Sequence, residues 1–201
     1  MRIVSAAMLA GFFATAGLAI DPPTMKAVRI HEFGGLDALS YESAPRPVAA
    51  AGEMVVRVKA AGVNPVDAGV RKGWLKGRVK LPFTPGFDVS GVVDSVGDGI
   101  TRFKNGDQIF AYMDLSRGGG YAEFAIVKET EAAPKPSRLS HVEAAGVPLA
   151  ALTAWQALFD SAKLQKGQTV LIHGGSGGVG TMAVQLAKWK GATVIATASA
   201  E

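Results

Sequence analysis

Three glycines with a characteristic spacing are the residues whose chemistry is most readily identified in this sequence. Gly175, Gly177 and Gly180 fit the pattern G-x-G-x-x-G, in which the first glycine permits a sharp turn and the second lets a pyrophosphate approach the backbone. The third lets a helix pack closely on a strand. Phosphate oxygens would accept hydrogen bonds from free N–H groups at the start of that helix. The candidate contact residues are Gly174, Gly175, Ser176, Gly177, Gly178, Val179 and Gly180.

The segments on either side of this loop are of the kinds that a dinucleotide site needs. A short apolar run at 169–173 predicts a strand, and apolar residues at helical spacing over 179–190 predict an amphipathic helix. Gly191 suits the position just beyond the helix end, and the apolar run at 192–197 predicts a second strand. We therefore expect a complete β-α-β unit that binds a dinucleotide. The alternative is a glycine-rich turn with a structural role only.

The end of the second predicted strand bears on which dinucleotide is bound. An NAD site usually holds an acidic residue there for the ribose 2′-hydroxyl, whereas this chain has Thr197, Ala198 and Ser199. With no carboxylate to repel a 2′-phosphate, the sequence favours NADP(H), with Thr197 and Ser199 as contact candidates. Glu201 lies close enough in the chain to keep NAD(H) open as the alternative.

The composition of the chain bounds the other classes of function. The 201 residues are 48% hydrophobic, enough for one or two domains with a core. A net charge of +4 with scattered basic residues gives no reason to expect a nucleic-acid partner. The chain has no cysteine, which excludes disulfides, thiolate nucleophiles and cysteine-based zinc sites. The histidines His31, His141 and His173 are too far apart in sequence to indicate a ligand cluster, so we expect no metal site.

Residues 1–24 differ in kind from the rest and are interpreted as a signal-like leader. Arg2 precedes an unbroken run of apolar and small residues, and Gly17 and Ala19 provide small residues at the positions that a signal peptidase inspects. The run is short and lacks a stop-transfer flank, so we expect no stable membrane span. This interpretation predicts processing after Ala19 and an exported or periplasmic protein. Translation from Met25, with a cytoplasmic product, is the alternative.

Residues 25–150 predict a β domain. Short runs of β-forming residues alternate with glycine-rich turns, a pattern that is typical of a small barrel or sandwich. The predicted strands are 26–31, 39–42, 54–60, 89–96, 108–112 and 121–127.

A helical joint should connect this domain to the dinucleotide unit in residues 151–201. Ser140 and Glu143 form a capping box, so a helix is expected to begin there. Its helical character continues towards Phe159 with a break near Pro148.

Seven motifs occur in the order in which the medium-chain dehydrogenase/reductase superfamily has them. Together they cover essentially all of residues 25–201, and they most resemble the zinc-independent quinone oxidoreductase, or zeta-crystallin-like, branch. The motifs are Met25-Lys26-Ala27-Val28, Ala61 to Asp67, Pro85 to Val93, Gly106 to Ile109, Gly119 to Glu123, Leu152 to Trp155 and the glycine loop.

This resemblance implies both a fold and an activity. It implies an α/β protein in which a GroES-like β-barrel domain is followed by the first β-α-β unit of a Rossmann domain. NADPH would bind in the cleft between the domains and transfer hydride to a small electrophilic substrate, a quinone or an α,β-unsaturated carbonyl. We expect a homodimer in a full-length form.

The residues that bind zinc in other branches are replaced in this chain. Zinc-dependent relatives have a cysteine in the region of Gly62-Val63-Asn64, and Gly-His-Glu where this chain has Gly86-Phe87-Asp88. The lobe that holds a structural zinc in those relatives is absent as well. Without a Lewis acid an alcohol is not readily activated, so we expect reduction of an acceptor that is already electrophilic.

The resemblance also assigns roles to individual side chains. Asn64 matches an asparagine at the nicotinamide and substrate end, where its amide would orient a carbonyl oxygen; the alternative is a helix cap. Asp67 is a second catalytic candidate, with a structural helix carboxylate as its alternative. Thr153 matches a threonine that contacts the nicotinamide, with plain packing as its alternative. Tyrosines that relatives often carry after the Asn-Pro motif are missing, so water, Tyr112 or Tyr121 would supply the proton.

A full doubly wound domain has six strands, and this sequence predicts two of them. On the order of 100 further residues would complete it, so we expect the chain to be a fragment. The apolar strand at 169–173 predicts burial on both faces, one of them by that further part. Two functions stay open: a zinc-independent NADPH oxidoreductase, and a truncated, non-catalytic nucleotide-binding or structural protein of the same fold.

Overall fold

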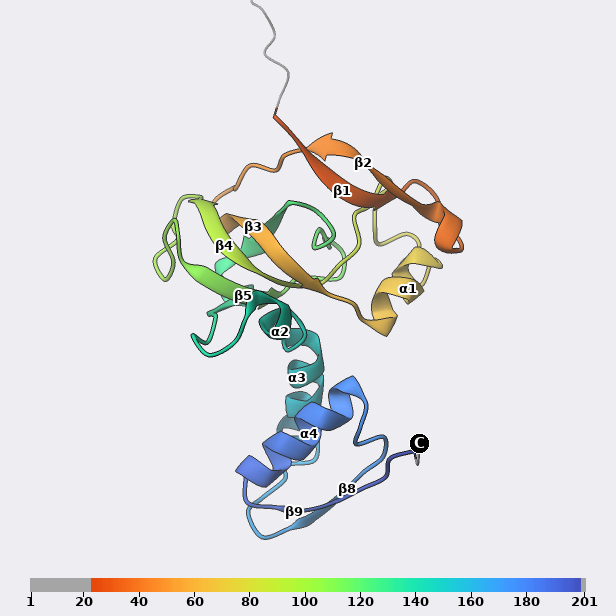
Figure 1. The fold of residues 1–201 in the computed structure, drawn as a ribbon, viewed down its shortest axis with the longest axis vertical. Coiled ribbons are helices and arrows are strands. Elements are labelled where there is room, and N and C mark those ends of the chain that lie inside the picture. The colour runs from red at the N-terminus through yellow and green to blue at the C-terminus, as the bar shows by residue number, and fades with distance from the viewer. Residues whose placement is uncertain (1–22, 200–201) are drawn as a thin grey trace, which may run out of the picture.

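The computed structural model of the chain describes residues 23–199. The signal-like residues 1–19 and Glu201 lie outside this range. A β domain, a helical joint and a small unit of one helix with two strands follow one another along the long axis of the molecule (Figure 1). This arrangement confirms the α/β fold class expected from the sequence.

A five-stranded antiparallel sheet with the order β6-β3-β4-β5-β7 forms the centre of the β domain. Met54, Val89 and Ile109 are completely buried on its inner face. Two shifts in the register between β3 and β4 bend the sheet around this core. The strands are β3 (Glu53–Gly62), β4 (Asp88–Val96), β5 (Gln108–Tyr112), β6 (Phe124–Lys128) and β7 (Ala132–Pro134).

A second small core lies between an outer strand pair and the first helix. Ile30 exchanges backbone hydrogen bonds with Phe83, which ties the outer pair to the rest of the domain. The buried side chains of Ile30, Val70 and Phe87 fill the space between them. The elements here are β1 (Thr24–Ile30), a 3₁₀ helix (Leu36–Ala38), β2 (Leu39–Pro45) and α1 (Pro65–Arg71).

The helical joint begins with the capping box that the sequence predicts. Ser140 Oγ accepts a hydrogen bond from the Glu143 N–H at 3.2 Å, and Glu143 Oε2 accepts one from the Ser140 N–H at 2.8 Å. A break at Gly146 separates two helices, and the predicted domain boundary at 150 falls inside the second one. The joint consists of α2 (His141–Ala145), α3 (Pro148–Trp155) and a π-helical turn (Gln156–Ser161), after a 3₁₀ helix at Glu129–Glu131.

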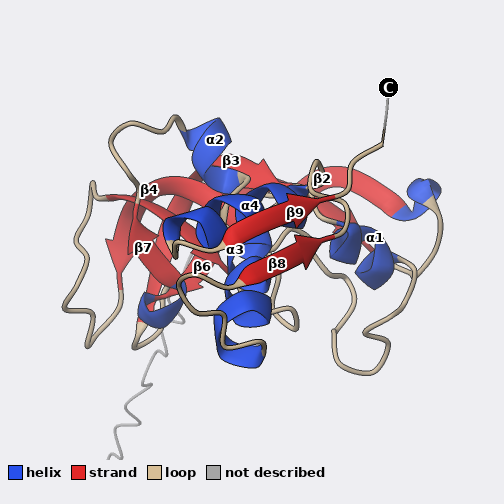
Figure 2. Cartoon of the chain, turned by 90° about the horizontal axis from the view of Figure 1, so that it is seen from below, coloured by secondary structure: helices blue, strands red, loops and turns tan. Residues whose placement is uncertain are grey.

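The last unit consists of β8 (Thr169–Ile172), α4 (Gly178–Trp189) and β9 (Thr193–Ala196). The two strands pair in parallel in the register that aligns Thr169 with Thr193, and α4 crosses between them (Figure 2). Gly191 has a φ of +83°, the left-handed conformation that suits the residue beyond a helix end. The predicted β-α-β unit is therefore present.

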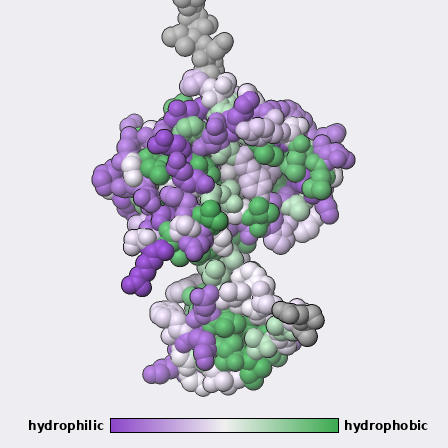
Figure 3. Space-filling view, in the orientation of Figure 1, coloured by the Kyte–Doolittle hydropathy of each residue, from purple (hydrophilic) through white to green (hydrophobic). Residues whose placement is uncertain are grey.

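Only one face of this two-stranded sheet is covered within residues 23–199. Ile172 faces α4 and is 8% exposed, whereas Leu171 and Ile195 on the opposite face are each 55% exposed. The lower part of the molecule accordingly presents a group of hydrophobic residues at its surface (Figure 3). Within residues 23–199, the strand that leads into the glycine loop is therefore packed on its α4 side only.

Candidate functional site

The glycine loop that connects β8 to α4 is shaped by close backbone approaches. Gly174 has a φ of +70°, which favours glycine. A Cβ atom added at Gly175 would lie 2.8 Å from the Cβ of Ala196, and one added at Gly180 would lie 2.0 Å from the Gly174 carbonyl oxygen. Side chains at these positions would push the helix away from the loop and the second strand.

Free backbone donors line the start of α4. The Thr181 N–H donates to the Gly177 carbonyl at 2.8 Å, so the N–H groups of the three helical residues before it precede the intrahelical hydrogen bonds. They lie at the positive end of the helix dipole. Gly177 itself has an extended backbone, and a Cβ there would meet only the Gly174 oxygen, at 3.3 Å. These N–H groups, two of which belong to glycines, suit an anion such as a pyrophosphate.

Thr197, just beyond β9, holds the loop in place. Its hydroxyl oxygen accepts a hydrogen bond from the Gly174 N–H at 3.1 Å, and its carbonyl accepts one from the Gly175 N–H at 2.8 Å. The structure therefore brings Thr197 together with the predicted phosphate residues. Ser199 is exposed near the end of the described residues.

Asn64 lies immediately before α1 with an extended backbone. Its backbone N–H donates to Asp67 Oδ2 at 2.7 Å, while its side chain turns elsewhere and donates from Nδ2 to Asp88 Oδ2 at 2.9 Å. The two predicted catalytic residues, Asn64 and Asp67, are thus neighbours. The side-chain amide of Asn64 is held by a third residue that the sequence analysis did not select.

Both carboxylate oxygens of Asp67 accept hydrogen bonds from the backbone. Besides the bond from Asn64, Oδ1 accepts the Gly86 N–H at 3.0 Å. The residue is only 6% exposed, and this burial raises the pKa of Asp67, although the N–H donors act in the opposite direction. The geometry is that of a carboxylate that fixes the start of α1 and the loop before β4.

Asp88, the first residue of β4, is the main site residue that sequence reasoning missed. It is 1% exposed, and its Oδ1 accepts a hydrogen bond from the Leu149 N–H at 3.0 Å. Burial raises the pKa of Asp88 to about 6, and the Asp67 charge adds to this, against the lowering effect of its two donors. The available signal was the position of this carboxylate between Phe87 and Val89, where an ionised group that becomes buried needs specific partners.

Thr153 lies one turn into α3 from Leu149. Its hydroxyl donates to the Leu149 carbonyl at 2.8 Å, a bond within the helix, and its side chain remains exposed. The backbone of Leu149 thus donates to Asp88 from its N–H and accepts from Thr153 at its carbonyl oxygen.

Two tyrosines that could supply a proton lie close to these carboxylates. Tyr112 pairs with Asp88 across β4 and β5, and burial followed by the charges of Asp88 and Asp114 raises its pKa. The Tyr121 hydroxyl lies 3.5 Å from the Gly62 carbonyl, and burial followed by the charge of Asp67 raises its pKa well above the usual range. Both hydroxyls therefore keep their protons at neutral pH.

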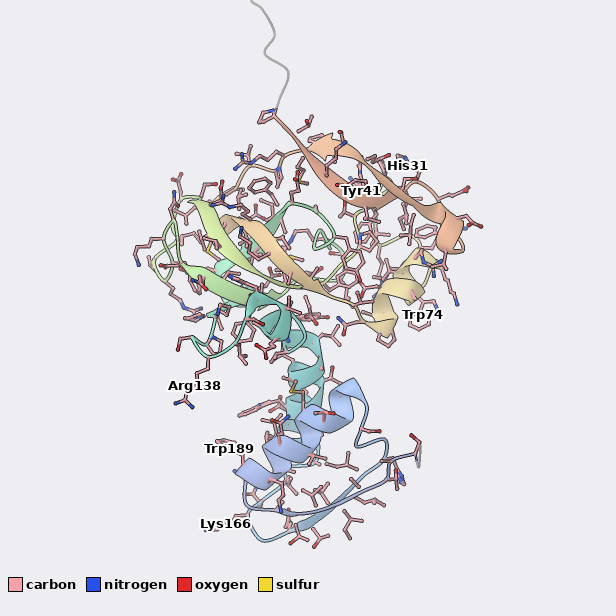
Figure 4. All side chains as sticks on the ribbon, in the orientation of Figure 1. His31, Tyr41, Trp74, Arg138, Lys166 and Trp189 are labelled. Atoms are coloured by element: carbon pink, nitrogen blue, oxygen red, sulfur yellow. The ribbon has the colours of Figure 1, made fainter. Side chains whose placement is uncertain are left out.

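A cavity of about 380 Å³ opens beside Tyr112. Leu75, from the segment after α1, also lines it. Trp74 in the same segment is 72% exposed and points away from the central sheet (Figure 4), with its ring against Gly69. The full lining of the cavity is Leu75, Arg78, Tyr112, Asp114, Leu115 and Ser116.

Two kinds of feature are absent from residues 23–199. No group of three or more histidine and acidic side chains in this range is arranged to hold a metal ion. Of the helices in the same range, none has both the length and the hydropathy of a membrane-crossing segment.

Comparisons with known proteins agree with this architecture. Residues 50–137 match the family described as the alcohol dehydrogenase GroES-like domain. The chain is 40% identical to the quinone oxidoreductase of Rattus norvegicus over 185 residues, which is 92% of this chain and 56% of that protein. The chain thus spans about half the length of the curated relatives it matches.

Solved structures give the same result. The quinone oxidoreductase of Coxiella burnetii is 36% identical with a TM-score of 0.81, over 88% of this chain and 57% of that one. An alcohol dehydrogenase superfamily protein from Novosphingobium aromaticivorans is 38% identical with a TM-score of 0.82, over 88% and 54% respectively. With its GroES-like domain, its glycine loop and these relatives, the chain belongs to the medium-chain dehydrogenase/reductase superfamily.

Proposed function

We propose that this chain belongs to an NADPH-dependent oxidoreductase that transfers hydride to a quinone or an α,β-unsaturated carbonyl without zinc. The main observation behind the proposal is the glycine loop, in which the first N–H groups of α4 and the space left by Gly177 suit a pyrophosphate. The relatives named quinone oxidoreductase support the choice of acceptor. The replacement of the relatives' zinc ligands in Gly62-Val63-Asn64 and Gly86-Phe87-Asp88 supports the zinc-independent chemistry.

The cofactor proposal rests on the region after β9. Thr197, Ala198 and Ser199 place no carboxylate where a 2′-phosphate would be repelled. NADPH should therefore bind more tightly than NADH in the full-length protein. A fluorescence titration of both reduced nucleotides tests this, and equal or tighter binding of NADH would contradict it.

The residues of this chain would divide the work as follows. The glycine loop holds the pyrophosphate, and the bound cofactor supplies the hydride. One Nδ2 hydrogen of Asn64 is bonded to Asp88, so the other is free to donate to a substrate carbonyl. Because both tyrosine hydroxyls stay protonated, Tyr112, Tyr121 or water can supply the proton that completes the reduction.

The main test of the proposed function replaces Gly177 with valine. A side chain at this position makes one tight contact within the protein, so the fold should survive while the approach of a pyrophosphate is blocked. Gly35→Val is the matched control, since a Cβ at Gly35 meets nothing within 4 Å. We expect at least a tenfold loss of NADPH affinity in Gly177→Val only. If a folded Gly177→Val protein bound NADPH with normal affinity, the loop would have a structural role only.

A second candidate is a nucleotide-binding or structural protein of the same fold without turnover. It is favoured by the single β-α-β unit in residues 23–199, which provides one side of a cofactor cleft. The 201-residue chain would then bind NADPH without oxidising it in the presence of a quinone. Oxidation of NADPH by the purified chain would overturn this candidate.

For the compartment, we propose that residues 1–19 act as a cleaved export signal. The order of basic start, apolar run and small residues supports this. N-terminal sequencing of the protein from its own host tests it. A start at Ile20 agrees with export, and a start at Met25 or Lys26 restores the cytoplasmic alternative.

A further inference from the structure

Asp88 occupies a confined position where three elements meet. Its carboxylate contacts Asn64 before α1 and Leu149 in the first turn of α3. Space around it is restricted, since a Cβ added at Gly62 would lie 2.9 Å from Asp88 Cβ and 2.4 Å from the Ala145 carbonyl oxygen. The carboxylate therefore has little freedom to change partners.

The chemistry of this contact fixes the orientation of the Asn64 amide. An ionised carboxylate has acceptor atoms only, so the amide nitrogen of Asn64 must face Asp88. The amide oxygen and the second N–H hydrogen are then turned to the other side. A neutral carboxyl group could donate to the amide oxygen instead, and both orientations of the amide would become possible.

The second oxygen of Asp88 has a defined task at the joint. The residue before α3 is Val147, which has no side-chain acceptor, and Pro148 has no N–H, so Leu149 provides the first backbone donor of the helix. Asp88 satisfies that donor from another part of the fold and places a negative charge at the positive end of α3. The carbonyl of the same Leu149 accepts the Thr153 hydroxyl.

We propose that Asp88 is a positioning residue that sets the amide orientation of Asn64 and, through Leu149, fixes the start of the helix that carries Thr153. It would thereby fix the position of Asn64, at the substrate end of the site, relative to Thr153, at the nicotinamide end. The assignment of Asn64 and Thr153 to those ends rests on the proposed function. The positioning itself is a property of the chain without cofactor.

This role makes the network sensitive to pH near neutrality. Burial brings the pKa of Asp88 to about 6, so its carboxylate is ionised above that pH and neutral below it. The titratable groups on the elements packed around it are Asp67 on α1, Tyr112 on β5, Tyr121 before β6, and His141 on α2, which bonds to Ser90 at 2.8 Å. Burial lowers the pKa of His141, and the charges of Lys135 and Lys59 act in the same direction, so this histidine needs its own control.

Nuclear magnetic resonance of the 201-residue chain from pH 4.5 to 8 tests the proposal. The side-chain NH₂ signals of Asn64 and the backbone N–H signal of Leu149 should shift together with one midpoint near 6. Asp88→Asn should abolish this shared transition. An amide at position 88 presents a second donor to Asn64, so the Asn64 amide should rotate and its protons should exchange with water at least tenfold faster.

Two controls separate this effect from others. Asp94→Asn makes the same change on the same strand, at a carboxylate paired with Arg46, and should leave the midpoint unchanged. His141→Gln removes the histidine that bonds to Ser90 on the same strand and should also leave it unchanged.

Different midpoints for Asn64 and Leu149 in the unmodified chain would overturn the proposal, as would persistence of the shared transition in Asp88→Asn. The unmodified chain decides the matter even if a variant fails to fold. A shared transition, together with a full-length protein that does not bind NADPH, would refute the proposed function and leave the positioning role intact.

Discussion

The glycine loop is built from backbone groups, whereas the Asn64 end of the site is built from side chains. In the loop, residues 173–197 of one continuous β-α-β unit supply every contact, and the shape follows from where a Cβ is absent. At the other end, the contacts of Asp88 span 24 residues to Asn64 and 61 residues to Leu149. The first region is sensitive to added volume and the second to changes in charge.

The largest effect should come from added volume at Gly180. Its Cβ would lie 2.0 Å from a carbonyl oxygen, so Gly180→Val must separate α4 from the loop. We expect this unit to lose about 3 kcal/mol or more of its free energy of unfolding. Hydrogen exchange resolved by segment measures it, with the five-stranded sheet as an internal reference. Unchanged protection in α4 would show that the loop is not closely packed.

The glycine loop and its β-α-β unit could be predicted from sequence because all their contacts lie within one short segment. Glycine spacing, an apolar strand and a helical pattern are local signals, and together they define a β-α-β unit. The Asp88 contacts could not be predicted in this way, because no periodicity specifies which strand position faces which loop. The sequence shows Asp88 between Phe87 and Val89, but its burial and its partners depend on the register between β3 and β4 and on the placement of α3.

A change of charge at Asp88 should have the next largest effect. The pKa of Asp88 is about 6 in the folded chain and near 3.8 when unfolded, so between these values the folded state binds more protons and its stability falls as the pH rises. The shift corresponds to about 3 kcal/mol lost between roughly pH 4 and pH 7, as an upper limit. Asp88→Asn has no such titration.

Denaturant titrations of both proteins across this range measure the difference. Carboxylates with lowered pKa values, such as Glu129 and Glu143, make the protein less stable as the pH falls. Their effect on the total free energy of unfolding is therefore opposite to that of Asp88. These contributions cancel when the free energy of unfolding of the variant is subtracted from that of the unmodified chain at each pH. We expect the variant to gain relative stability as the pH rises, and a flat difference curve would contradict this.

A smaller loss of stability is expected at Thr197, the side chain that contacts the glycine loop. Thr197→Val removes the hydroxyl that accepts the Gly174 N–H but keeps the shape of the side chain. We expect a loss of about 1 kcal/mol in the free energy of unfolding of the β-α-β unit. Thr197→Ser keeps the hydroxyl and is the matched control. If both variants lost the same stability, the methyl group and not the hydrogen bond would hold the loop.

The smallest effect concerns the strand that precedes the loop. Leu171 and Ile172 are adjacent on β8, yet Leu171 is 55% exposed and Ile172, which packs against α4, is 8% exposed. In this chain Leu171→Thr should change the free energy of unfolding by less than about 0.5 kcal/mol, because a β-branched residue suits an exposed strand position. Ile172→Thr should cost about 2 kcal/mol or more, since it places a hydroxyl against the apolar side of α4. Thermal denaturation of the two variants compares them directly. If Leu171→Thr were as destabilising as Ile172→Thr, the face of the sheet away from α4 would be buried in solution, and the support of the loop would come from both sides of β8.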